Sequence, residues 1–191
     1  MFGSRLKYAF MVLAVFALIG YSGCILSPDE EVPQKPPVAN YKSLTDKENI
    51  IYNLIQCYKE RDKPHYEELL NDAYEWHNQD ESINDRAKDI EQTNRLFDMA
   101  NSSPNVPPLW WLDKLELTIA QPGTWQQIDT LGTVSCDDCW ETTRDYYIVA
   151  RINGGATTYI GNAKATFIAI GVPEGGKRIY RLRHIYDIPN L

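Results

Sequence analysis

Three long segments in the second half of the chain alternate apolar and polar residues, and they constrain the fold more than any other feature. They are Trp140–Ile152, Thr157–Gly171 and Lys177–Ile188. Such alternation is typical of β-strands that bury one face. Asn153-Gly154-Gly155 predicts a tight hairpin between the first two strands, because Asn-Gly supplies the positive φ of such turns. We therefore expect a long antiparallel meander, preceded by one more strand over about 110–119.

The first half of the chain has helical periodicity instead. Thr45 and Glu48 fit a capping box, which predicts that a first helix starts there and runs to about residue 60. A second, short helix is expected over His65–Asn71 after Pro64, followed by a short strand over Ala73–Asn78. A third helix is expected over 83–100. Its predicted buried face consists of Ile83, Ala87, Ile90, Asn94 and Phe97.

Helices that come first and strands that follow predict an α+β fold. The second long segment, Thr157–Gly171, carries Gly and Ala on one face, which suits a bent strand or a closely approaching element. We expect N-terminal helices packed on a strongly curved antiparallel sheet.

Residues 1–24 have the pattern of a secretory signal peptide. Arg5 and Lys7 precede the apolar run Tyr8–Gly20, and small residues follow up to Cys24. A helix of about 13 residues rises only about 20 Å, which is short of a bilayer core of about 30 Å. The alternative interpretation is an uncleaved anchor helix.

Tyr21-Ser22-Gly23-Cys24 resembles the lipobox of bacterial lipoproteins, although Tyr21 departs from the usual Leu. The resemblance implies that the signal peptide, residues 1–23, is removed and that Cys24 is acylated, palmitate being a typical chain. Two or three acyl chains anchor a protein stably in a membrane. The expected location is the cell envelope, outside the cytoplasm. Ile25, where inner-membrane lipoproteins often carry Asp, favours the outer membrane if two membranes are present.

Residues 24–41 are expected to be the anchor and a proline-rich tether, and residues 42–191 the folded domain. Four prolines and a polar remainder cannot form a packed core, so the tether is expected to be a semi-extended spacer. The alternative is a proline-rich ligand, because Pro33 and Pro36 form a PxxP motif. The net charge is −7, and it becomes −9 when Arg5 and Lys7 leave with the signal. Such a chain is not expected to bind nucleic acid.

The segment from Leu44 to His77 resembles the opening of NTF2-like (SnoaL-like) domains. These have a long and a short helix with a Tyr-x-x-Leu-Leu pattern, here Tyr66, Leu69 and Leu70, and then an aromatic strand. The terminal segment Arg181–Ile185 extends the resemblance to about Asp187. More narrowly, the chain is similar to uncharacterised bacterial lipoproteins that combine a lipobox, a tether and this domain. The resemblance implies a cone in which helices cap a bent sheet and enclose a pocket.

NTF2-like domains include isomerases, dehydratases, cyclases, ligand carriers and interaction modules. Their enzymes usually work through one pocket Asp or an Asp–His pair, whose pKa burial moves toward neutrality. His184 is the catalytic candidate here, because its strand face is expected to point inward. Glu75, His77 and Asp113 are weaker candidates. No catalytic motif transfers residue by residue.

The aromatic residues of the domain have two interpretations. They line a ligand pocket with hydroxyls in its wall, or they form the core of a small domain. The residues predicted to bind a ligand are Tyr58, Tyr66, Trp76, Trp111, Tyr146, Tyr180 and His184.

The cysteines favour structure over chemistry. Cys136 and Cys139 form a CxxC motif in an expected loop, which in an oxidising compartment favours a local disulfide. Free thiols, a link to Cys57, and a redox or metal site are the alternatives. No metal site is expected, because no second CxxC or paired His supplies the remaining ligands. No cofactor is expected either.

These features predict a lipid-anchored, extracytoplasmic domain that binds a ligand or a protein. Its partners are expected to be the membrane, through Cys24, and a small apolar ligand or a protein. A homodimer is also compatible with the family. The alternative is a small pocket enzyme, an isomerase or hydro-lyase that uses a buried His or carboxylate.

Overall fold

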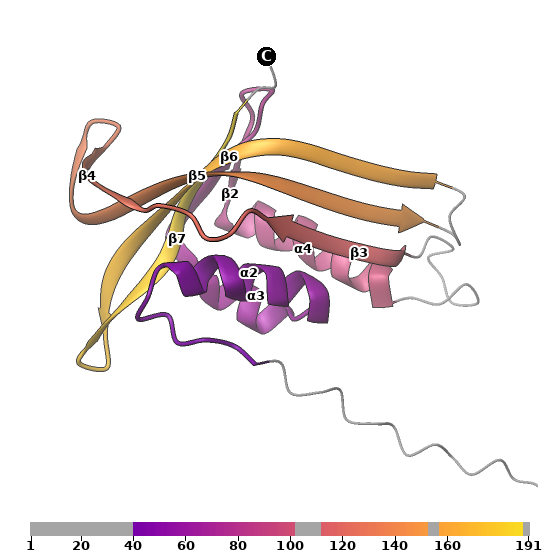
Figure 1. The fold of residues 1–191 in the computed structure, drawn as a ribbon, viewed down its shortest axis with the longest axis horizontal. Helices are drawn as coiled ribbons and strands as arrows, with labels where there is room; N and C mark the ends of the chain where they lie inside the picture. Colours follow the sequence, from indigo (N-terminus) through magenta and orange to yellow (C-terminus); the bar gives the residue numbers. More distant parts are fainter. Residues whose placement is uncertain (1–39, 102–111, 153–156, 189–191) are drawn as a thin grey trace, which may run out of the picture. The chain divides into compact units, whose positions relative to one another are not determined.

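The computed structural model describes residues 40–101, 112–152 and 157–188. Three helices precede most of the sheet in this part of the chain (Figure 1). In chain order, the elements are α2 (Glu48–Glu60), α3 (Lys63–Leu69), β1 (Leu70–His77), β2 (Ile83–Asp85), α4 (Arg86–Asn101), β3 (Leu112–Ile119), β4 (Gln126–Leu131), β5 (Val134–Ile152), β6 (Thr157–Glu174) and β7 (Lys177–Ile188). Among the described helices, none is long and apolar enough to span a membrane.

The sheet is mixed, with strand order β2-β1-β7-β6-β5-β3 and with β4 paired to β5. β1 runs parallel to β7, whereas every other described pair is antiparallel. The expected antiparallel sheet is thus confirmed for all pairs but one, and the parallel pair of β1 with β7 was not predicted. The meander over β5, β6 and β7 is as predicted, but the early strand β1 joins the far side of β7. β1 and β7 are far apart in the sequence. Alternation of apolar and polar residues within a strand does not predict which distant strand it pairs with.

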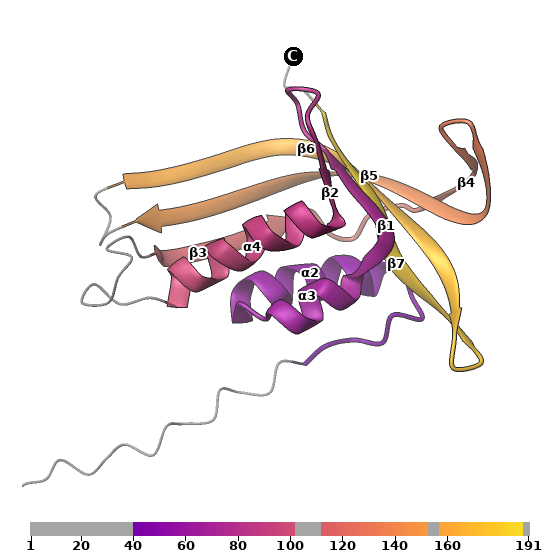
Figure 2. The same ribbon diagram turned by 180° about the vertical axis from the view of Figure 1, so that it is seen from behind.

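The three helices lie on one face of the sheet (Figures 1 and 2). The predicted apolar stripe of α2 is buried, and Ile50, Ile51 and Cys57 are fully inaccessible. The stripe belongs to one core cluster with side chains from three strands, β3, β6 and β7, among them Leu115, Leu117, Phe167, Leu182 and Ile185. Burial of this apolar surface is the main favourable contribution to folding.

The start of α2 differs from the predicted capping box. The helix begins at Glu48, and its N-cap residue Lys47 makes no side-chain cap. Thr45 Oγ1 lies instead 3.2 Å from Ser43 Oγ. The Glu48 carboxylate turns toward the sheet and pairs with the buried Arg144 guanidinium. An unpaired buried charge costs more free energy than the loss of one capping hydrogen bond. The Glu48 side chain therefore pairs with Arg144 and does not cap the helix.

The buried face of α4 also differs from the prediction. Residues 83–85 form strand β2, and Ile83 is 52% exposed. The buried residues are Asp89, Thr93 and Phe97, because polar groups of α4 meet tyrosine hydroxyls inside the domain. The prediction was therefore confirmed at Phe97 and in part at Ile90, whereas Ile83 and Ala87 are exposed.

The CxxC motif lies inside strand β5 and not in a loop. Cys139 pairs with Ile128 of β4, a strand that the sequence analysis did not predict because most of its side chains are exposed. Cys136 and Cys139 are joined by a disulfide, and Cys57 is free and buried. Burial raises the pKa of the Cys57 thiol to about 12, so it is protonated at neutral pH.

Candidate functional site

The interior between the helices and the sheet is filled by side chains. A cavity of about 20 Å³ remains there, walled by aliphatic residues of α2, β3, β5 and β7 and by five aromatic residues: Tyr58, Tyr66, Trp76, Tyr146 and Phe167. About 10–15 Å³ is needed to hold one water molecule, whereas ligand pockets usually measure about 300–1,000 Å³. The interior of the described domain therefore has room for about one water and not for a substrate.

A buried carboxylate lies beside this interior. Asp89 on α4 is 3% exposed, and it accepts a 2.5 Å hydrogen bond from the Tyr66 hydroxyl. Desolvation raises the pKa of Asp89 to about 6, and the Tyr66 hydrogen bond partly offsets that rise. The rings of Tyr58, Tyr66 and Phe97 meet edge to face at 5.3–6.2 Å between centroids. These contacts make Asp89 part of a closed polar cluster within the core.

The predicted ligand-binding residues do not all meet. The structure brings Tyr58, Tyr66, Trp76 and Tyr146 around the small cavity, but it does not bring Tyr180 or His184 there. Tyr180 packs against the edge of the core near Leu44, and the Lys47 ammonium lies 5.5 Å from its ring centroid. Trp111 lies outside the described residues.

A β-bulge in β7 explains the position of His184. Leu182 pairs with Ala169 of β6, and His184 pairs with the adjacent Ile168. Arg183 is therefore the extra residue of the bulge, with no paired residue on β6. One extra residue reverses the alternation along the strand. Leu182 and Ile185 therefore both line the interior, and His184 and Tyr186 line a groove elsewhere on the domain. His184 is buried, as predicted, but it is not inside the cone.

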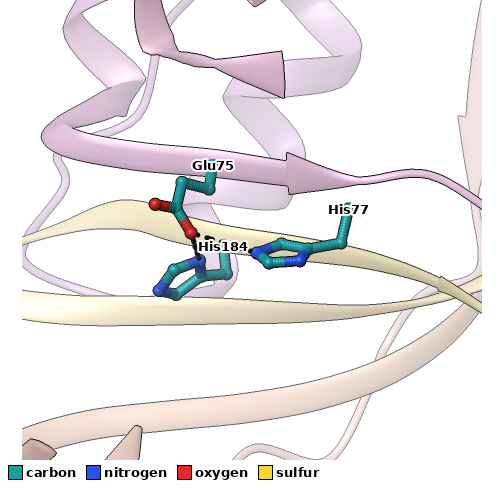
Figure 3. A group of neighbouring side chains, drawn as sticks. All are labelled: Glu75, His77 and His184. Carbon is teal, nitrogen blue, oxygen red and sulfur yellow. Dashed lines mark hydrogen bonds and ion pairs between the residues drawn. The ribbon is translucent and has the colours of Figure 1, made fainter. Parts of the chain in front are cut away.

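His184 lies beside two side chains of β1 (Figure 3). The parallel register places Glu75 opposite His184 and His77 opposite Tyr186. His77 Nε2 lies 3.1 Å from Glu75 Oε2, and His184 Nδ1 lies 3.5 Å from the same oxygen. His77 also stacks on Tyr186, with 4.3 Å between ring centroids. We call Glu75, His77 and His184 the two-histidine cluster.

The electrostatics of the cluster favour a neutral His184. Desolvation, together with the positive charge of Arg183, lowers the pKa of His184 to about 4. Glu75 acts in the opposite direction but does not outweigh the two. At neutral pH this ring is therefore an uncharged imidazole with a free lone pair on one nitrogen, which is the form that ligates metals.

Two members of the cluster, Glu75 and His184, line a groove of about 390 Å³. Its other wall is formed by residues 131–136, which are the end of β4, the turn after it and the start of β5. Sequence reasoning named each member of the cluster separately but expected no metal site. The Glu-x-His spacing on β1 is a signal for a shared strand face, but the third residue comes from a strand more than 100 positions away in the sequence.

The comparisons with known proteins identify the fold. No family model and no curated protein matches the sequence. Among solved structures, an NTF2-like protein of unknown function in nutrient uptake from Rhodospirillum rubrum superposes with a TM-score of 0.53 at 12% identity. The alignment covers 76% of this chain and 99% of that one.

Two further structures are similar to the domain. An NTF2-like superfamily protein from Salmonella enterica has a TM-score of 0.55 at 9% identity, over 76% of this chain and 89% of that one. The hexachlorocyclohexane dehydrochlorinase LinA-type3 from Novosphingobium barchaimii has a TM-score of 0.51 at 8% identity, over 74% and 82%. Identities this low carry the fold and not the activity. The chain thus has the α+β NTF2-like fold, with N-terminal helices on a mixed, mostly antiparallel sheet.

Proposed function

We propose that this protein is a lipid-anchored protein of the cell envelope whose NTF2-like domain is a binding module. One observation carries the second half of the proposal: the interior of the cone is filled, with about 20 Å³ left. An isomerase or hydro-lyase of the cone type needs an open cavity with a titratable group inside it. Asp89 is titratable, but its carboxylate is buried among core residues and already accepts a hydrogen bond from the Tyr66 hydroxyl.

The anchoring half of the proposal depends on the sequence. The charged start, the short apolar run and the small residues before Cys24 support export and acylation. The net charge of −9 after removal of the signal repels the domain from anionic lipid, so that the acyl chains and not the charge would hold it at the membrane. The outer membrane is the proposed location in a cell with two membranes.

Replacement of Cys24 by Ala tests the anchor. We expect the full-length chain to fractionate with membranes in its native host and the Cys24→Ala variant to leave the membrane fraction. Cys57→Ala is the matched control, because this buried thiol has no role in anchoring and the variant is expected to stay with the membrane. A Cys24→Ala chain that remains membrane-bound would refute the lipoprotein assignment.

Native mass spectrometry tests the binding module. The full-length chain is extracted from its host in mild detergent and analysed without denaturation. We expect a complex with another protein or with a second copy of the chain, because the interior leaves no room for a small apolar ligand, and the added mass distinguishes the two partners. A chain that is always monomeric and carries only its acyl groups would contradict the proposal.

A further inference from the structure

His184 presents a buried nitrogen that the described protein does not satisfy. Its side chain is 6% exposed, and Nδ1 has no hydrogen-bond partner. Glu75 Oε2 is 3.5 Å away, within reach of an ion pair but not hydrogen-bonded. Buried polar atoms without a partner are rare, because the lost hydration is not replaced. The nitrogen points at the two other members of the cluster, so a ligand at that position would satisfy it.

The three side chains supply the donor set of a transition-metal site. Two imidazoles and one carboxylate hold catalytic zinc in several enzymes, with one coordination position left open. One donor atom from each of the three residues lies within 4.8 Å of the others. Tetrahedral Zn²⁺ with bonds of about 2.1 Å separates its ligand atoms by about 3.4 Å. The distances of 3.1 and 3.5 Å from Glu75 Oε2 to the two imidazoles already match that separation.

The surrounding residues hold the donors in place. The parallel pairing of β1 with β7 fixes Glu75 opposite His184, and stacking on Tyr186 orients the His77 ring. Metal sites built on strands are held more accurately than sites on loops. The groove of about 390 Å³ is lined by Glu75 and His184, so an ion bound between them would have a route of entry and an open coordination position.

We propose that Glu75, His77 and His184 bind one divalent transition metal ion, of which Zn²⁺ is the best match to the donor set. His184 binds through Nδ1, His77 through Nε2 and Glu75 through a carboxylate oxygen. The position left open faces the groove. Arg183 also lines the groove and carries a positive charge, so the fourth ligand would be water or a small anion. The site does not depend on the lipid anchor or on the filled cone.

Zinc titration of the full-length chain in detergent tests the site. The protein is stripped with EDTA and kept under non-reducing conditions, so that Cys136 and Cys139 stay in their disulfide. Bound zinc is then counted after gel filtration, and the affinity is measured by competition with a chromophoric chelator. We expect one zinc per wild-type chain, together with a rise in Tm on zinc addition, because a ligand that binds only the folded state stabilises it.

Three variants identify the ligands. We expect His77→Ala, Glu75→Gln and His184→Ala each to weaken zinc binding by at least about 10–100-fold, which is the loss that even outer-shell partners cause. His77 and Glu75 are partly exposed, so these two variants should fold even if His184→Ala does not. Thermal unfolding in EDTA verifies that each variant is folded.

His65→Ala is the matched control. His65 is the remaining histidine of the chain, lies 2.8 Å from a carboxylate of Asp62, and is more exposed than His77. We expect this variant to bind zinc like the wild type. Absence of zinc binding by the wild type, or an equal loss in His65→Ala and His77→Ala, would overturn the proposal. Binding that survives in all three ligand variants would also overturn it. The Cys24→Ala chain should keep its zinc, which separates this test from that of the anchor.

Discussion

At the scale of single residues, several polar groups are placed where the apolar pattern does not predict them. Asp89 and Thr93 occupy the buried face of α4, and Arg144 is 3% exposed on the inner face of β5. The two charged groups have specific partners: Tyr66 for Asp89, and Glu48 for Arg144. Buried polar groups are tolerated only with such partners. These residues are therefore where substitution and pH should have the largest effects.

Asp89 should make the domain less stable as the pH rises. Its pKa is about 6 in the folded state and 3.8 in its ordinary state, so the folded chain holds the proton more tightly. Between these two values the folded state binds more protons, and its stability therefore falls as the pH increases. We expect Asp89→Asn to remove this dependence and to gain about 2 kcal/mol relative to the wild type between pH 4 and pH 7.

Urea denaturation at several pH values measures the effect. The difference between Asp89→Asn and the wild type cancels the titration of other groups, such as Glu48, whose pKa is lowered first of all by its hydrogen bond to Arg144 and which acts in the opposite direction. A constant difference from pH 4 to pH 7 would show that Asp89 is not protonated in the folded state.

At the scale of elements, one ion pair connects the first turn of α2 to the sheet. Arg144 on β5 donates through Nη1 to Glu48 Oε1 at 2.8 Å and through Nη2 to Glu48 Oε2. Trp125 Nε1 donates to the same carboxylate at 3.0 Å, and Arg144 also donates to the Ala120 carbonyl. A two-pronged contact of this kind fixes direction as well as distance. It sets where α2 begins in place of the predicted capping box.

Loss of the Glu48 charge should therefore be costly. We expect Glu48→Gln to destabilise the domain by about 3 kcal/mol, because it leaves a buried guanidinium without its counter-charge. The matched control is Asp113→Asn, which neutralises a carboxylate 2.6 Å from the more exposed Arg151. That change should cost less than about 1 kcal/mol. Chemical denaturation of both variants checks the contrast, and equal losses would contradict a special role of the Glu48–Arg144 pair.

At the scale of the whole domain, side chains fill the space between the helices and the sheet in the described part of the chain. The helices and the sheet are arranged as in NTF2-like proteins, but aromatic and aliphatic side chains occupy the interior. The two-histidine cluster lies outside this interior, because the bulge at Arg183 turns the His184 side chain toward a separate groove. The fold alone does not determine the binding surface. That surface depends on which side chains fill the interior and which line the outer groove.

Truncation of a core residue should open the cone. Phe167 is 3% exposed and contributes to the wall of the small cavity. We expect Phe167→Ala to destabilise the domain by about 3–5 kcal/mol and to create an apolar cavity able to bind benzene. The wild-type chain should not bind benzene. Tyr147→Ala, on the exposed face of β5, is the control and should change stability little. Benzene binding by the wild type, measured by thermal stabilisation, would show that the cone is already open.

The sequence by itself determined most of the elements. Alternation predicted β5, β6 and β7, with the last strand at its observed bounds, and the apolar stripe of α2 proved to be the buried one. These features are local, because a period of 2 or of 3.6 residues is a property of neighbours along the chain. The N-terminal pattern around Cys24 is equally local, and the lipid anchor remains a prediction of the sequence.

The tertiary structure alone decided which distant residues meet. The parallel pairing of β1 with β7, the bulge that turns His184 away from the interior, and the polar face of α4 all depend on contacts between segments far apart in the chain. The physical reason is that a buried polar group can be satisfied by any partner the fold brings near, and periodicity does not identify that partner. The two-histidine cluster is therefore visible only in three dimensions.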